Sequence, residues 1–178
     1  MRTKLADTAR ITALSGLLLL SLLLTGARAD VARTGLSNPE RLGSVTVRYL
    51  GIAIYDAELF TSGGTDFRWQ APMALRLTYR RGFSADQLTD ATMTEITRMN
   101  GESASDAKLR ADLATCYRDV KKGDEITATS QGSNAVSLWL NNRKVCTLNS
   151  AGIQKRFFGI WLAPESRMAR LSPQLKGK

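Results

Sequence analysis

The sequence predicts an α+β protein in which helices cover one face of a largely antiparallel sheet. Three observations lead to this fold class. Apolar runs typical of strands open the domain, two helical segments follow, and three short strands joined by tight turns precede a last apolar helix. The chain has 178 residues, which is enough for one domain with a core of its own.

The first 29 residues have the pattern of a secretory signal that is cleaved from the mature protein. Basic residues precede an apolar run at 17–24, and Ala27-Arg28-Ala29 has the small-x-small pattern of a signal-peptidase site. The apolar run is too short to span a bilayer comfortably. We therefore expect a signal peptide at 1–29 and a secreted, periplasmic protein that begins at Asp30. The alternative is an uncleaved membrane anchor.

An irregular segment at 30–43 is expected to lead into a domain at 44–178. Glycine, asparagine and proline interrupt any apolar pattern in the first of these ranges. From Arg48 to Phe60, apolar residues occupy odd and even positions alike. That pattern is typical of a strand covered on both faces, so we expect a central strand there.

A half-buried strand and a well-marked helix come next. Apolar residues alternate at 73–79 and leave Arg76 on the polar face. Ser84 and Gln87 form a capping box, which predicts the start of a helix that an Asn-Gly pair ends. We expect Glu95 to lie on the solvated surface of this helix.

A second helix, a three-stranded meander and a third helix complete the predicted domain. The second helix starts near Ser105, and the strands are expected at 126–130, 136–140 and 144–148. The Asn141-Asn142 pair predicts a tight hairpin, because asparagine tolerates positive φ. Asn149 or Ser150 is expected to cap the third helix, whose predicted buried side is Ile153, Phe157, Ile160 and Trp161.

Composition excludes several classes of chemistry. The absence of histidine excludes Ser-His-Asp catalysis and imidazole metal sites. Two cysteines are too few for a thiolate metal cage, so we expect no metal. Cys116 and Cys146 either form a disulfide, worth about 3–4 kcal/mol in the chain-entropy model, or remain two buried thiols. Cys116 falls on an apolar helix face, which suits the second reading.

The formal net charge of +9 is spread over the chain without a long basic block. This pattern favours a solvated surface over nucleic-acid binding, and we expect no nucleic-acid partner. It leaves a weak attraction to an anionic membrane surface open.

Five segments, taken in order, resemble chalcone-isomerase-like proteins and are closest to the bacterial exported branch. The resemblance covers about 42–171, and its segments are 51–60, 75–86, 120–124, 139–142 and 157–162. It implies an open-faced β-sandwich, with a large antiparallel sheet, helices packed on one face, and a cleft between the two layers.

The resemblance does not extend to the catalytic residues of the plant enzymes, which cyclise chalcones. In an ungapped alignment, the positions of a strand threonine, a helix tyrosine and a helix asparagine hold Leu50, Leu88 and Glu95. Leucine cannot position a phenolate or a water molecule as a hydroxyl does. We therefore assign no catalytic residue and do not expect isomerase activity of the plant kind.

Related members of the family bind a fatty acid in the cleft, with an arginine and a tyrosine at its polar end. An interior rich in aromatic residues with arginines nearby suits such a ligand, because guanidinium binds carboxylate bidentately. We expect a fatty-acid-like apolar or amphipathic ligand and no cofactor. The residues expected at the polar end of the ligand are Arg41, Arg48, Tyr49 and Tyr55.

Two alternatives stay open beside ligand binding. One is a structural or interaction module with a packed interior, and the other is an isomerase with a rearranged site. A continuous cavity of about 300 Å³ beside Tyr49 and Tyr55 would favour binding over the packed module. An arginine pointing into that cavity would keep the isomerase alternative. The sequence does not decide the oligomeric state or the ligand.

Overall fold

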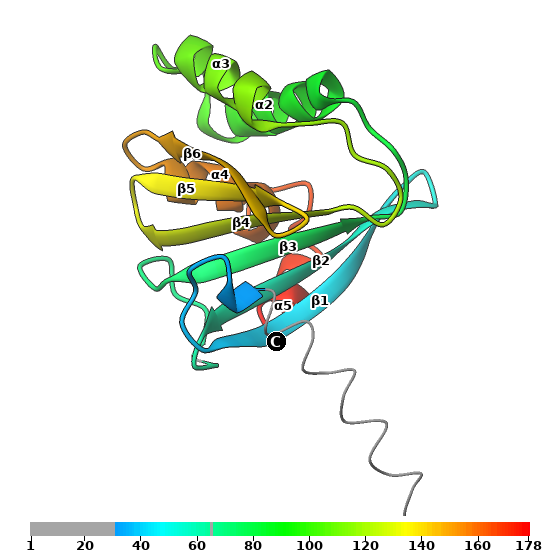
Figure 1. Ribbon diagram of the computed structural model, residues 1–178, viewed down its shortest axis with the longest axis vertical. Helices are drawn as coiled ribbons and strands as arrows, with labels where there is room; N and C mark the ends of the chain where they lie inside the picture. The colour runs from blue at the N-terminus through cyan, green and yellow to red at the C-terminus, as the bar shows by residue number, and fades with distance from the viewer. Residues whose placement is uncertain (1–30, 65) are drawn as a thin grey trace, which may run out of the picture.

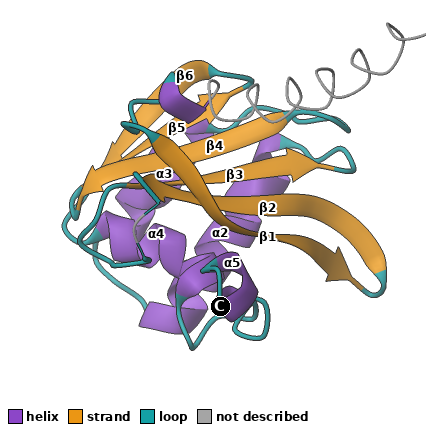
Figure 2. Cartoon of the chain, turned by 90° about the horizontal axis from the view of Figure 1, so that it is seen from below, coloured by secondary structure: helices purple, strands orange, loops and turns teal. Residues whose placement is uncertain are grey.

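The computed structural model describes residues 31–64 and 66–178, which form one antiparallel sheet with helices against it (Figures 1 and 2). The sheet has six strands in chain order, so each strand pairs with the one before it. The strands are β1 (Pro39–Tyr49), β2 (Ile52–Ser62), β3 (Met73–Tyr79), β4 (Glu125–Gly132), β5 (Ala135–Leu140) and β6 (Arg143–Asn149). The helices are α2 (Ala85–Asn100), α3 (Asp106–Cys116), α4 (Ile153–Leu162) and α5 (Ser172–Leu175). The predicted α+β class with a large antiparallel sheet is confirmed.

The signal peptide predicted at 1–29 and the mature terminus at Asp30 lie outside the described residues. Within the two described ranges, no helix is both long enough and apolar enough to cross a membrane.

The stretch 48–60 is not one central strand, as the sequence suggested, but turns back on itself. Leu50 and Gly51 both have positive φ, at 48° and 78°, and Tyr49 pairs with Ile52 across the turn. Two consecutive positive φ angles make the two-residue turn of a hairpin. β1 is consequently an edge strand. The turn escaped prediction because leucine rarely adopts such a backbone conformation.

β1 begins at Pro39, inside the segment 30–43 that was expected to be irregular. The predicted domain start at 44 therefore falls within a strand. Close packing explains the glycine at position 43 of β1. A Cβ at this position would overlap the carbonyl oxygen of Gln174, because α5 crosses β1 closely here.

β3 matches its predicted range, but its second face is not solvated. Arg76 is buried, and its guanidinium donates to Glu58 Oε2 from Nε at 2.9 Å and from Nη2 at 2.5 Å. The Arg76 guanidinium also lies 5.3 Å from the centre of the Phe60 ring. Phe60 forms a small apolar cluster on this face with Val31, Leu36 and Ala74. The first described residues therefore cover the sheet face opposite the helices.

α2 follows its sequence signals closely, whereas α4 begins at a different cap from the predicted one. The capping box of α2 is present, with the Gln87 amide donating to Ser84 Oγ and the Ser84 amide donating to Gln87 Oε1. In α4, the cap is Gly152 at φ 67° instead of the predicted Asn149 or Ser150. The buried side of α4 includes all four predicted residues.

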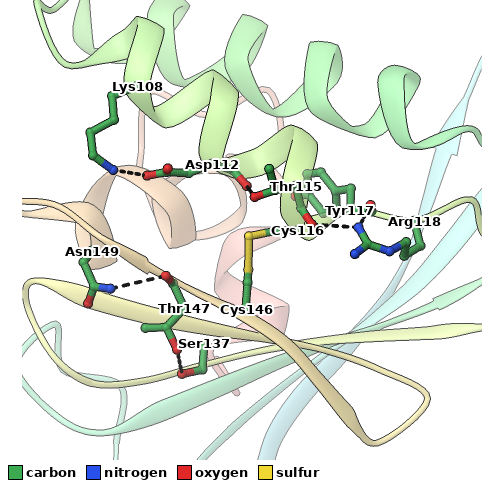
Figure 3. Close-up of a disulfide and its surroundings, with 10 residues drawn as sticks. All are labelled: Lys108, Asp112, Thr115, Cys116, Tyr117, Arg118, Ser137, Cys146, Thr147 and Asn149. Carbon is green, nitrogen blue, oxygen red and sulfur yellow. Dashed lines mark hydrogen bonds and ion pairs between the residues drawn. A yellow bond between two sulfur atoms is a disulfide. The ribbon is translucent and has the colours of Figure 1, made fainter.

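A disulfide joins Cys116, at the end of α3, to Cys146 on β6 (Figure 3). The two Cα atoms are 5.4 Å apart, and the cysteines are separated by 30 positions in the sequence. Closing a loop of this size contributes about 3–4 kcal/mol in the chain-entropy model. The disulfide thus attaches the outer helix to the edge strand, which decides between the two readings that the sequence left open.

Candidate functional site

A cavity of about 290 Å³ lies between the sheet and the helices. Its floor comes from β2, β3 and β4, because the period of two along a strand turns alternate side chains toward the helices. These floor residues are Tyr55, Leu75, Leu77, Tyr79, Ile126 and Ala128. α2 and α4 supply the opposite wall, chiefly with Leu88, Thr92, Phe157, Ile160 and Trp161. The lining is therefore mostly apolar.

Four tyrosines line the cavity, and three of them, Tyr55, Tyr79 and Tyr117, bring their hydroxyl groups to its interior. The indole Nε1 of Trp161 donates to the Tyr55 hydroxyl at 2.9 Å, and Tyr117 shares a hydrogen bond of 2.9 Å with Thr92. Burial raises the pKa of Tyr55 and of Tyr117 to about 12, and it raises the pKa of Tyr79 well above its ordinary value. All three are neutral phenols near pH 7, so they are suited to hydrogen bonding and not to removing protons.

Glu95 brings a carboxylate to the cavity, although the sequence analysis placed it on the solvated surface. It lies seven residues after Leu88, which is close to two turns, so both side chains share one face of α2. Its side chain is only 14% exposed. Arg98 donates to Glu95 Oε2 from Nη2 at 2.9 Å, and Arg167 Nη1 lies 2.6 Å from Oε1. The Arg167 contact is an ion pair without the alignment of a hydrogen bond.

The cavity opens to solvent between the β1–β2 hairpin, α2 and the segment after α4. The lining residues at this mouth are exposed: Tyr49 is 70% exposed, and Gln87, Ala91 and Arg167 are exposed as well. Arg167 is the one positively charged residue among the described residues that line the cavity. A polar head group at the mouth would therefore meet a guanidinium.

The four residues expected at the polar end of a ligand separate into two groups. Tyr49 and Tyr55 line the cavity. Arg41 and Arg48 do not. Arg41 Nη1 donates to Glu58 Oε1 at 2.6 Å on the opposite face of the sheet, and Arg48 Nη1 donates to the Gly51 carbonyl at 3.1 Å. The prediction that these arginines hold a ligand finds no support in their positions.

Sequence reasoning missed two charged residues of the cavity for different reasons. Glu95 was within reach, because counting its helical phase from Leu88 puts it on the inner face. Arg167 had no such signal. It follows α4 in a segment of turns, and only the packing of that segment against α2 brings it to Glu95.

Comparisons with known proteins agree with this architecture. The family model described as chalcone isomerase-like matches residues 48–176. Among solved structures, a crystal structure of an Arabidopsis thaliana fatty-acid binding protein has a TM-score of 0.57 and 12% sequence identity, with 76% of this chain and 86% of that chain covered. No curated protein has a significant match to the sequence. The family match extends over most of the chain, and the chain belongs to the chalcone isomerase-like family.

Proposed function

We propose that this protein binds a small apolar or amphipathic molecule in the cavity without transforming it, and that a fatty acid is the leading candidate. The observation that carries the proposal is the mostly apolar cavity of about 290 Å³. Protein interiors are close-packed and contain few voids larger than a water molecule, so a packed module would not contain such a space. The likeness to a fatty-acid binding protein supports this ligand class.

Charge distribution supports one orientation of the ligand. The deep part of the cavity is formed by apolar side chains such as Leu75, Leu77 and Phe157, which suit an acyl chain. The guanidinium of Arg167 is at the mouth, and its side chain is 63% exposed. Guanidinium has several donors in a planar fork, so Arg167 can contact a ligand carboxylate while it remains beside Glu95. We therefore place the head group at the mouth.

The size of the cavity limits the ligand. Pockets for small molecules range from about 300 to 1,000 Å³, so this one is at the lower end of the range. A short or medium acyl chain fits this volume better than a long one, which would extend out of the mouth.

We also propose that the protein acts in the periplasm. The pattern of the first 29 residues supports export. The disulfide between Cys116 and Cys146 fits an oxidising compartment, where such bonds persist. Intact mass spectrometry of the protein from a periplasmic extract tests the proposal, with a chain that begins at Asp30 as the expected result. Full-length chain confined to the cytoplasm would contradict it.

The binding proposal is tested by extracting natively purified protein with organic solvent and identifying the released molecules by mass spectrometry. A stoichiometric fatty acid is the expected result. Protein that is empty and also fails to bind added fatty acids of any chain length would refute the proposal.

The orientation is tested with three matched substitutions, Arg167→Gln, Arg41→Gln and Arg48→Gln. A guanidinium–carboxylate contact is worth about 1.5–3 kcal/mol, so Arg167→Gln should weaken fatty-acid binding by at least about tenfold. Binding of the fatty alcohol of equal length should change little, because it has no carboxylate. The other two variants should bind both ligands as the parent protein does. Equal losses for acid and alcohol would refute the assignment of Arg167.

A further inference from the structure

The turn between β1 and β2 exposes three large apolar residues beside the mouth of the cavity. Leu50 is 84% exposed, Tyr49 is 70% exposed and Ile52 is 45% exposed, and these are the large apolar residues most exposed among those that the structure describes. In Figure 1 this turn projects at the right edge of the molecule. Tyr49 also lines the cavity, as does Ile54 just after the turn. The apolar tip and the mouth therefore form one continuous surface.

The folding of the hairpin gives no reason for leucine at the turn. Both turn residues have positive φ, a conformation for which Asn-Gly and Asp-Gly are strongly preferred. The same chain follows that preference at its β5–β6 turn, where Asn141 and Asn142 have φ of 47° and 64°. A bulky apolar residue at positive φ is unfavourable locally, and Leu50 gains almost no burial in return. This combination indicates that the side chain contacts something outside the molecule.

Basic side chains gather at the same end of the molecule. Arg48 belongs to the hairpin. Arg80 and Arg81 directly follow β3, and the Arg80 amide donates a hydrogen bond to the Ile54 carbonyl, which holds them near the hairpin. Lys121 and Lys122 lie in the turn whose Gly123 amide donates to the Tyr79 carbonyl. All of these cationic side chains are exposed.

The carboxylates of this end neutralise only part of that charge. Asp56 forms an ion pair with Arg80 and also interacts with the charge of Arg48. Asp119 and Asp124 accept backbone hydrogen bonds, and Asp124 also interacts with the charge of Lys121. No ion pair with a carboxylate is found for Arg48, Arg81, Lys121 or Lys122 within the described part of the chain. An apolar, tyrosine-bearing tip surrounded by cations matches the layered chemistry of an anionic bilayer, where apolar and aromatic groups enter the interface and cations meet the head groups.

We propose that the β1–β2 turn docks on an anionic lipid surface and thereby places the mouth of the cavity against the bilayer. An amphipathic ligand then passes between membrane and cavity without crossing bulk water. The docking depends only on the tip and its cations, whereas its use for ligand transfer rests on the proposed function.

Docking is tested with the full chain and vesicles of phosphatidylethanolamine with phosphatidylglycerol, against vesicles of phosphatidylcholine. Hydrogen exchange followed by mass spectrometry reports on the tip directly, even if the first 29 residues remain attached. We expect slower exchange at residues 48–54 with the anionic vesicles, and unchanged exchange at the β4–β5 turn at the opposite end of the sheet. Unchanged exchange at 48–54 would overturn the proposal.

The variant Leu50→Asn separates docking from folding. Asparagine suits the turn, so the melting temperature should not fall, but the vesicle partition coefficient should fall at least about tenfold with the loss of a buried leucine. Lys122→Gln should reduce it about fivefold, and the matched Lys155→Gln, on α4 near the opposite end, should leave it unchanged. Equal partitioning of Leu50→Asn and the parent protein would overturn the proposal, because the exposed Leu50 side chain would then contribute nothing to the membrane contact.

Ligand binding in the absence of vesicles distinguishes the two proposals. Leu50→Asn should bind a fatty acid in solution as the parent protein does, while it transfers the ligand to vesicles more slowly. A parent protein that docks but binds no fatty acid would remove the transfer step and leave the docking in place.

Discussion

Filling the cavity distinguishes a ligand site from a packed interior. Ala128 is 3% exposed on β4, pairs with Leu75 on β3 and lines the cavity floor. Ala128→Leu adds three carbons, which project into the cavity. Because each buried CH₂ contributes about 0.8 kcal/mol, the free energy of unfolding of the ligand-free protein should rise by about 2 kcal/mol. A domain of this size gains about 2–4 °C in melting temperature per kcal/mol, so a rise of about 4–8 °C is expected.

The same change should reduce ligand affinity, because the added side chain occupies the volume that an acyl chain needs. Ala74→Leu is the matched control. Ala74 is fully buried on β3, but it points to the opposite face and packs with Phe60 in a closed cluster. Overpacking in that cluster should lower the free energy of unfolding by about 1–3 kcal/mol and leave ligand affinity unchanged. Urea unfolding and fatty-acid titration of both variants test the reasoning. Destabilisation by Ala128→Leu with undiminished binding would show that the cavity is not the ligand site.

Three further predictions concern stability. Tyr55→Phe should lower the free energy of urea unfolding by about 1–3 kcal/mol, because it leaves the buried Nε1 of Trp161 without an acceptor. Unchanged stability would show that water or another group replaces the hydroxyl as the acceptor. Cys116→Ser should cost about 3–4 kcal/mol, and reductant should lower the stability of the parent protein but not of the variant. Glu58 predicts a pH dependence. Burial acts to raise its pKa, but the hydrogen bonds from Arg41 and Arg76 outweigh burial and hold the pKa below its ordinary value of 4.5. The contribution of Glu58 to the free energy of unfolding is thus present above pH 4.5 and is lost as the pH falls through the lowered pKa. Glu58→Gln should make stability in urea unfolding depend less on pH in this range, and an unchanged dependence of stability on pH would contradict the assignment.

Interactions between residues close in sequence are sufficient to define several elements of this fold. The bounds of α2 followed from Ser84, Gln87 and Gly101, because caps act through hydrogen bonds within a few residues. The Asn141-Asn142 hairpin followed from the backbone conformations that asparagine tolerates. The period of side chains in β3 and α4 likewise identified which of their residues face the core.

Long-range packing decided the features that the sequence left unsettled or suggested wrongly. Leu50 accepts a positive φ against its own preference because the β1 and β2 ladders on both sides fix the turn. Arg76 is buried because distant residues at the start of the described chain cover its face of the sheet. Whether Cys116 meets Cys146 depends on where α3 lies over β6.

The sequence by itself determined the fold class, the identity of most elements and the apolar, aromatic character of the interior. Those properties depend on side-chain period, caps and turn residues, which neighbours along the chain define. Only the tertiary structure decided the cavity and its charges. It brings Glu95 on α2 and Arg167 after α4 within 2.6 Å at the mouth, and it leaves Arg41 on the opposite face of the sheet. Residues distant in sequence are brought together by the packing of whole elements, and no local sequence pattern shows which of them will meet.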